Sequence, residues 1–174
     1  QPILRGLRSA SPEIEQARVM RFDFHPTQTG WRISEVNSDV PGGFSEASEF
    51  TSMMARYYSG YRPAGLPGPA FADALALVAA RSGEKHRRAG LISAAGFMED
   101  LQVVSYLGRL LNARGVEPHL INPSHLRFDR GRAWVNDGWG PSELSVVVRF
   151  HQAEWLSRRR HAAVAPYLLG GGRT

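Results

Sequence analysis

Hydrophobic and polar residues alternate in two short runs near the start of the chain, and this alternation predicts two β-strands. In the first run, RFDFH, the charged residues point to one face while Phe22 and Phe24 point to the other. The second run is WRISEVN. Because the polar turn at 26–30 lies between the two runs, the pattern predicts an antiparallel hairpin.

Strand parity also predicts which side chains meet across this hairpin. Ile33, Glu35 and Asn37 are expected on one face of the second strand. A register centred on the turn places Asp23 opposite Glu35 and Arg21 opposite Asn37. Directly opposite residues lie about 5 Å apart at Cβ, so two carboxylates and an amide oxygen are expected beside a guanidinium.

Further along the chain, apolar residues recur at helical spacing in several stretches. Ser45 is the expected N-terminal cap of the helix that begins beside it. The predicted helices cover 1–18, 44–58, 69–81 and 98–113, with short pieces at 151–158 and 162–169.

Apolar runs between the helices predict the remaining strands. They cover 88–95, 118–121 and 144–150, and a second hairpin joins 126–128 to 132–135. This alternation predicts the α/β class, with an open, mainly parallel sheet flanked by helices and an antiparallel hairpin beside it. We expect a single α/β domain over 1–174, a candidate metal-site hairpin at 19–39 and a Rossmann-like α/β portion at 88–156.

The polar face of the first hairpin suits a magnesium–phosphate site. Magnesium takes hard oxygen ligands and commonly uses one or two carboxylates together with substrate phosphates. A divalent cation would remove the repulsion between Asp23 and Glu35, and Arg21 could bind a phosphoryl oxygen. An ordinary exposed hairpin with a solvated polar face fits the same alternation.

Composition narrows the choice of function without deciding it. The formal net charge is +5, and 20 of the 21 basic residues are arginines, which leaves nucleic-acid binding open as an alternative. The basic clusters, Lys85 to Arg88 and Arg158 to His161, lack interleaved aromatic residues, so solvated helix ends explain them more simply.

There is no cysteine, which excludes disulfides and thiolate metal sites. No apolar run is long enough to cross a bilayer, and a cytoplasmic location without membrane or nucleic-acid partners is expected.

Three sequence blocks follow one another along the chain: RFDF with GWRISEVNSDVPGGFSEAS, GFMEDLQVVSYLGRLLNARGVEPHLINPSHLRF, and ELSVVVRFHQAEWL. In this order they resemble the glutathionylspermidine synthase-like family of ATP-grasp ligases. The family pattern of Arg-x-Asp, Glu-x-Asn, an acidic residue and a proline is matched by Arg21, Asp23, Glu35, Asn37, Asp39 and Pro41. The resemblance covers about Val19 to Trp155, most of the chain.

The resemblance implies an ATP-dependent carboxylate–amine ligase that forms an amide through an acyl phosphate, with Mg²⁺ and ATP required. It implies that Asp23, Glu35 and Asn37 bind magnesium and that Arg21 is catalytic, stabilising the transferring phosphoryl group. The family's adenine pocket and lysine clamp follow the matched region, whereas this chain has one lysine, Lys85. Residues 1–174 are therefore expected to be the amino-terminal part of a longer ligase, and inactive alone.

The resemblance also makes Glu99 and Asp100 substrate-binding candidates, on the side where the amine approaches. The two residues follow the carboxyl end of a predicted strand and open a helix, whose dipole alone also accounts for an acidic pair. The expected partners are small-molecule or peptide carboxylates and amines. Glycines 42 and 43 stand where peptide-binding members carry hydroxyl residues, which argues against glutathione as the carboxylate substrate. A non-enzymatic or degenerate α/β module remains the alternative to a ligase.

Overall fold

The computed structural model describes residues 19–136, 138, 140–158, 162–165, 167 and 168. The helix predicted at 1–18 and most of the basic cluster at 158–161 lie outside the described residues. Among the helices that are described, none is long and apolar enough to cross a membrane.

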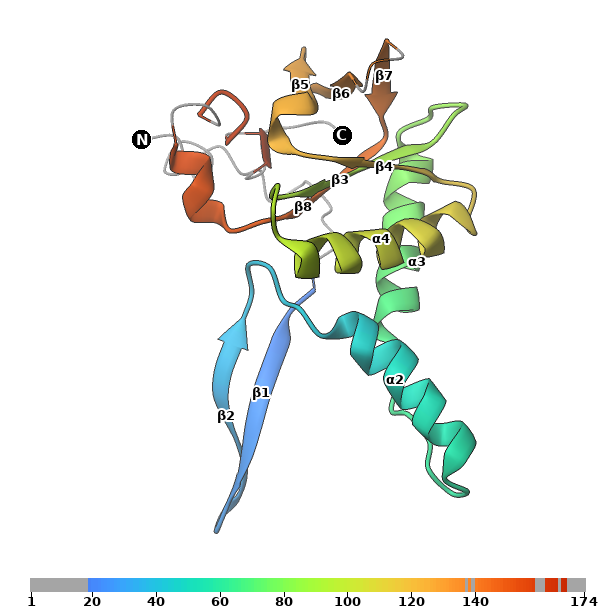
Figure 1. The fold of residues 1–174 in the computed structure, drawn as a ribbon, viewed down its shortest axis with the longest axis vertical. Helices are drawn as coiled ribbons and strands as arrows, with labels where there is room; N and C mark the ends of the chain where they lie inside the picture. Colours follow the sequence, from blue (N-terminus) through green and yellow to red (C-terminus); the bar gives the residue numbers. More distant parts are fainter. Residues whose placement is uncertain (1–18, 137, 139, 159–161, 166, 169–174) are drawn as a thin grey trace.

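The described residues form three small sheets and three α-helices, which are arranged as an α/β fold (Figure 1). The first sheet is the hairpin of β1 (Arg21–Thr27) and β2 (Gly30–Asn37). The second is parallel, with β4 (Glu117–Ile121), β3 (Arg88–Ser93) and β8 (Val146–Phe150) in that order. The third is antiparallel and contains β5 (Leu126–Asp129), β6 (Arg132–Asn136) and β7 (Pro141–Leu144). The α/β class is confirmed, but the expected mainly parallel sheet is limited to the three strands of the second sheet.

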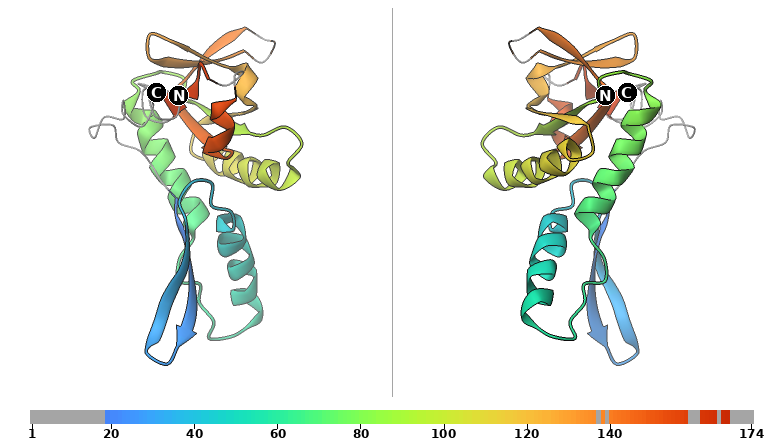
Figure 2. Two further views of the ribbon diagram at one scale, coloured as in Figure 1. Left: turned by 90° about the vertical axis from the view of Figure 1, so that its left-hand side faces the viewer. Right: turned by 90° about the vertical axis from the view of Figure 1, so that its right-hand side faces the viewer.

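The helices begin and end close to the predicted positions. They are α2 (Phe44–Tyr57), α3 (Pro67–Arg81) and α4 (Met98–Asn112). α4 packs on β3 and β4, and α3 packs between α2 and α4. The hairpin and α2 project to the same side, away from the two larger sheets (Figures 1 and 2).

The main core lies between the parallel sheet and the helices. Its fully buried side chains include Leu91 of β3, Leu107 of α4 and Val116 after α4. Phe44, at the start of α2, enters this core and meets Phe150 of β8 edge to face, with ring centroids 6.3 Å apart. Because Phe44 closely follows the hairpin, the entry of α2 into the core also fixes where the hairpin leaves it.

The predicted strand at 144–150 is divided into two. Leu144 ends β7 in the antiparallel sheet, and Val146 begins β8 in the parallel sheet. Between them, the Ser145 N–H donates to the carbonyl oxygen of Arg88 at 2.8 Å. The sequence LSVVVRF is uniformly apolar apart from Ser145 and Arg149, so its pattern did not reveal that the chain changes sheets.

The expected cap at Ser45 is wrong. Gly43 is the N-cap residue, with a left-handed φ of 89°, and Ser45 lies inside the first turn of α2. The Ser45 hydroxyl donates instead to Glu46 Oε2 at 2.6 Å, which helps to lower the pKa of Glu46. A positive φ is accessible to glycine without strain, so backbone geometry rather than side-chain capping begins this helix.

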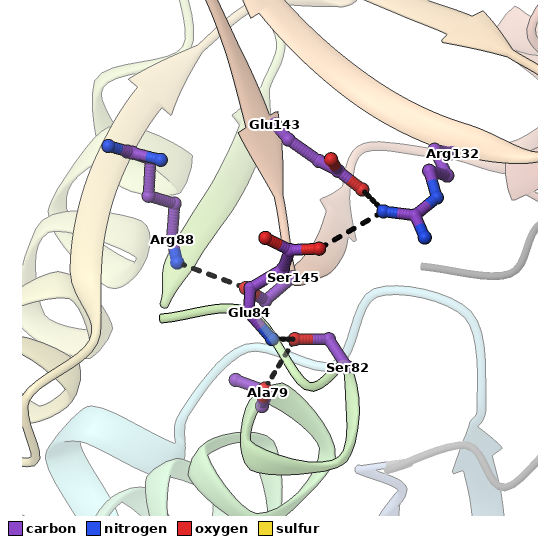
Figure 3. Close-up of polar contacts among 7 residues, drawn as sticks. All are labelled: Ala79, Ser82, Glu84, Arg88, Arg132, Glu143 and Ser145. Carbon is purple, nitrogen blue, oxygen red and sulfur yellow. Dashed lines mark hydrogen bonds and ion pairs between the residues drawn. The ribbon is translucent and has the colours of Figure 1, made fainter. Parts of the chain in front are cut away.

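A polar network joins the two larger sheets to the loop after α3 (Figure 3). Arg132 of β6 bridges Glu143 of β7 and Glu84 of the loop, with its Nη1 atom 3.0 Å from Glu84 Oε1. The Arg88 N–H donates to the Ser145 hydroxyl at 3.3 Å. These contacts hold the antiparallel sheet against the amino end of β3, at the opposite end of that strand from the candidate site.

We expect Gly68→Ala to destabilise the protein. A Cβ atom at Gly68, in the first turn of α3, would lie 2.6 Å from the Tyr106 ring and 3.0 Å from the Ser48 hydroxyl. Tyr106 cannot move freely because its hydroxyl donates to Glu49 at 2.9 Å. Overpacking of this kind costs about 1–3 kcal/mol, which denaturant unfolding would measure. The control is Gly65→Ala, where an added Cβ meets nothing within 4 Å.

Candidate functional site

The hairpin brings the predicted site residues together at its base. Asp23 pairs with Glu35 and Arg21 pairs with Asn37, as the strand pattern predicted. A β-bulge interrupts the pairing between Asp23 and Phe24, so Phe24 lies opposite Ile33.

This bulge corrects the expected position of Ile33. Strict alternation put Ile33 on the face of Glu35 and Asn37, whereas its pairing with Phe24 puts it on the apolar face. The polar face therefore continues from Arg21 and Asp23 to His25, which lies opposite Arg32, while Ile33 belongs to the apolar face. The Ser34 hydroxyl donates to the carbonyl oxygen of Asp23 at 3.0 Å across the irregular pairing.

Arg21 holds both facing carboxylates. Its Nε and Nη2 atoms donate to the two oxygens of Asp23 at 2.9 and 3.1 Å, and Nη2 lies 3.8 Å from Glu35 Oε1. The hydrogen bond and charge of Asp23, followed by the charge of Glu35, raise the pKa of Arg21. The side chains of Arg21 and Asp23 are 42% and 39% exposed, so solvent weakens the ion pair and leaves the group accessible to a ligand.

The donor set fits magnesium only in company with substrate oxygens. Among the described residues, no group of three or more His, Cys, Asp and Glu side chains could hold a metal ion. Asp23 and Glu35 supply carboxylate oxygens and Asn37 supplies an amide, which are hard donors of the kind magnesium takes. Both oxygens of Asp23 are bonded to Arg21. A metal would therefore have to compete with the guanidinium.

Asp39 ties the hairpin to the carboxyl end of the parallel sheet. Arg149 of β8 donates to Asp39 Oδ1, and the backbone N–H of Ala153 donates to Oδ2 at 2.9 Å. Ala153 begins the short 3-10 helix η2 (Ala153–Ser157). The sequence interpretation matched Asp39 to the family pattern without giving it a role, and it did not single out Arg149. A charged residue inside the apolar run LSVVVRF was a signal that Arg149 needed a partner.

Glu99 and Asp100 lie in the first turn of α4, as predicted. This helix follows β3, whose last residue, Ser93, pairs with Phe150 at the end of β8. The acidic pair therefore lies at the carboxyl end of the parallel strands, as Asp39 does. Burial, and then the charge of Glu99, raises the pKa of Asp100.

We expect Asp100→Asn to stabilise the protein at neutral pH. The pKa of Asp100 is raised above 3.8 in the folded state, so folding favours the protonated carboxyl group. The contribution of Asp100 to the free energy of unfolding is therefore fully present below pH 3.8 and is lost as pH rises through the folded pKa. Thermal melts should therefore show a higher melting temperature for Asp100→Asn at about pH 7 and little difference at about pH 3. Glu99→Gln is the control, with a smaller shift in the same direction. A less stable Asp100→Asn at neutral pH would show that the helix dipole outweighs burial.

Comparison with solved structures relates this chain to a known fold. No protein-family model and no curated protein matches the chain. Among solved structures, it is similar to a glutathione synthetase-like effector, GSS30 from Globodera pallida, in the apo form, with a TM-score of 0.64 and 16% sequence identity. The match covers 87% of this chain and 40% of the effector chain. The chain therefore shares the fold of part of a glutathione synthetase-like protein and spans less than half of that protein's length.

Proposed function

We propose that this chain is the metal-side part of an ATP-dependent carboxylate–amine ligase of the glutathionylspermidine synthase-like kind. The observation that supports this most is the arrangement of Arg21, Asp23 and Glu35 at the base of an exposed hairpin. The fold shared with a glutathione synthetase-like protein agrees with it. The 40% coverage of that neighbour leaves room for nucleotide-binding parts in a longer protein.

The proposed reaction has two steps. The terminal phosphoryl group of ATP passes to a carboxylate oxygen, which gives ADP and an acyl phosphate. An amine nitrogen then attacks the acyl carbon, inorganic phosphate leaves, and the amine loses a proton to complete the amide. Asp23, Glu35 and Asn37 would hold magnesium, which neutralises the phosphate charge during transfer.

Arg21 changes partner in this proposal. Before substrate binds, the guanidinium group of Arg21 donates hydrogen bonds to both carboxylate oxygens of Asp23. A phosphoryl group is a better partner for the guanidinium group because it carries more negative charge and accepts two parallel hydrogen bonds. Turning toward the phosphoryl group frees Asp23 for the metal, so one movement prepares both parts of the phosphate site.

Glu99 and Asp100 are proposed to receive the amine. Both carboxylates lie on the first turn of α4, and Glu99 is exposed. A cationic amine would relieve the repulsion between the two carboxylates, which contributes to the raised pKa of Asp100. Because the site offers two carboxylates, it favours amines that carry more than one positive charge.

The proposal is tested on the intact protein and on this chain separately. The intact protein should release ADP and form an amide with members of a panel of carboxylates and polyamines. Calorimetry should show only weak binding of Mg-ATP to residues 1–174, since two carboxylates and an amide make few contacts with a nucleotide. A low-micromolar dissociation constant for this chain would mean that the nucleotide site is misplaced. ADP release without any amide product would contradict the ligase.

A further inference from the structure

The segment that leaves the hairpin is held by a set of directional contacts. Asp39 accepts from Arg149 Nη2 and from the N–H of Ala153, and these partners lie 110 and 114 positions away in the sequence. Arg149 also donates through Nη1 to the carbonyl oxygen of His151. The Asp39 carboxylate therefore joins the hairpin exit, the segment that directly follows β2, to both β8 and η2.

The same short helix contacts the beginning of α4. The rings of Trp155, in η2, and Phe97, the residue before α4, meet edge to face with centroids 5.2 Å apart. The Arg158 guanidinium lies over the Trp155 ring, 4.8 Å from its centroid. η2 therefore connects the hairpin exit, through Asp39, to the helix that carries the acidic pair.

Apolar contacts alone would not set the direction of the hairpin. Val40 packs against the core and Phe44 is buried in it, but hydrophobic contacts are non-directional. The hairpin has no third strand to orient it, since β1 and β2 pair only with each other among the described strands. The two oxygens of Asp39, each with its own donor, supply the missing orientation.

We infer that Asp39 is a positioning residue, which holds the phosphate side of the site (Arg21, Asp23, Glu35) in register with the amine side (Glu99, Asp100). This inference rests on the proposed function. An acyl phosphate formed beside Arg21 must be reached by an amine bound at α4, and a misplacement of about 1 Å can cost about a hundredfold in rate. Without Asp39, water attacks the acyl carbon instead and returns the carboxylate and phosphate.

A distance measurement tests the orientation without any activity. The chain contains no cysteine, so His25→Cys and Gln102→Cys introduce one spin-label site on the hairpin and one on the exposed face of α4. We expect a narrow label-to-label distance distribution in this background and a broader one after Asp39→Asn. Arg149→Gln, which removes the same ion pair from the other side, should have the same effect.

The matched control is Asp73→Asn. It breaks another long-range ion pair, between Asp73 of α3 and Arg114 after α4, whose atoms lie 2.6 Å apart. The other partners of Arg114 are the carbonyl oxygens of Leu110 and Pro69, which lie in α4 and α3, so the label distances should not change. An unchanged distribution in both Asp39→Asn and Arg149→Gln would overturn the inference.

The activity measurement then separates positioning from general stability. In the intact protein, Asp39→Asn should keep most ADP release but lower the amide formed per ADP by about a hundredfold. A purely structural role would lower both products together and leave their ratio unchanged, which would overturn the inference. If the unmodified protein forms no amide, the proposed function fails, while the label distances still decide whether Asp39 orients the hairpin.

Discussion

Replacing Asp23 with Asn or Glu35 with Gln should abolish amide formation by the intact protein. Each change is nearly isosteric and removes a charge that the metal–phosphate site requires. Charge stabilisation by a bound metal is worth several kcal/mol, so the loss should be about a thousandfold in rate. ADP release and amide product, measured with the same substrate panel, give the result.

The fold should survive both substitutions. Arg21 lies between the two carboxylates and compensates their charges, and the group is exposed, so melting temperatures should stay close to that of the unmodified protein. Asp129→Asn is the matched control, because Asp129 is an exposed strand carboxylate in the β5–β6 hairpin. Full activity in the Asp23 and Glu35 variants would leave the ligase without its chemical basis, and the hairpin would then be an exposed structural element.

Arg21 should give two opposite effects in two assays. Arg21→Lys should lower amide formation by about a hundredfold or more, because an ammonium group cannot reproduce the two-pronged contact with phosphoryl oxygens. Arg21→Ala should bind Mn²⁺ more tightly than the unmodified chain when nucleotide is absent. The reason is that the guanidinium no longer occupies the oxygens of Asp23. Manganese relaxation measurements on residues 1–174 report this affinity.

The control for Arg21 lies on the same hairpin. Arg32 is exposed, lies opposite His25 and donates to the Thr29 hydroxyl at 3.0 Å. Arg32→Ala should change neither amide formation nor Mn²⁺ binding. Equal Mn²⁺ affinity in Arg21→Ala and the unmodified chain would contradict the proposed competition between arginine and metal.

Local patterns predicted the hairpin well because its register depends on neighbouring residues. Strand parity and the polar turn gave the pairing of Asp23 with Glu35, which the structure confirms. The bulge was missed because the prediction assumed strict alternation, whereas Ile33 and Val36 share the apolar face although they are three positions apart. Ile33 was therefore placed on the wrong face.

The remaining misses involve contacts between distant parts of the chain. The break at Ser145 depends on its hydrogen bonds with Arg88, a residue 57 positions earlier. The link between Asp39 and Arg149 spans 110 positions. Local sequence patterns describe single elements, whereas such contacts arise only when the elements pack. The roles proposed for Arg21, Asp23, Glu35, Asn37, Glu99 and Asp100 remain predictions.

The two-stranded construction of the hairpin has a consequence for its motion. β3 is flanked by strands on both edges, so its amides should exchange with solvent only when the whole domain unfolds. β1 and β2 lack such neighbours, and Trp31 near the turn is 71% exposed, so the tip can open locally at small cost. Arg21 and Asn37 pair at the other end of the hairpin, next to the core. The hydrogen bonds near Thr27 and Gly30 can therefore open and close rapidly while the residues at the base of the hairpin keep their arrangement.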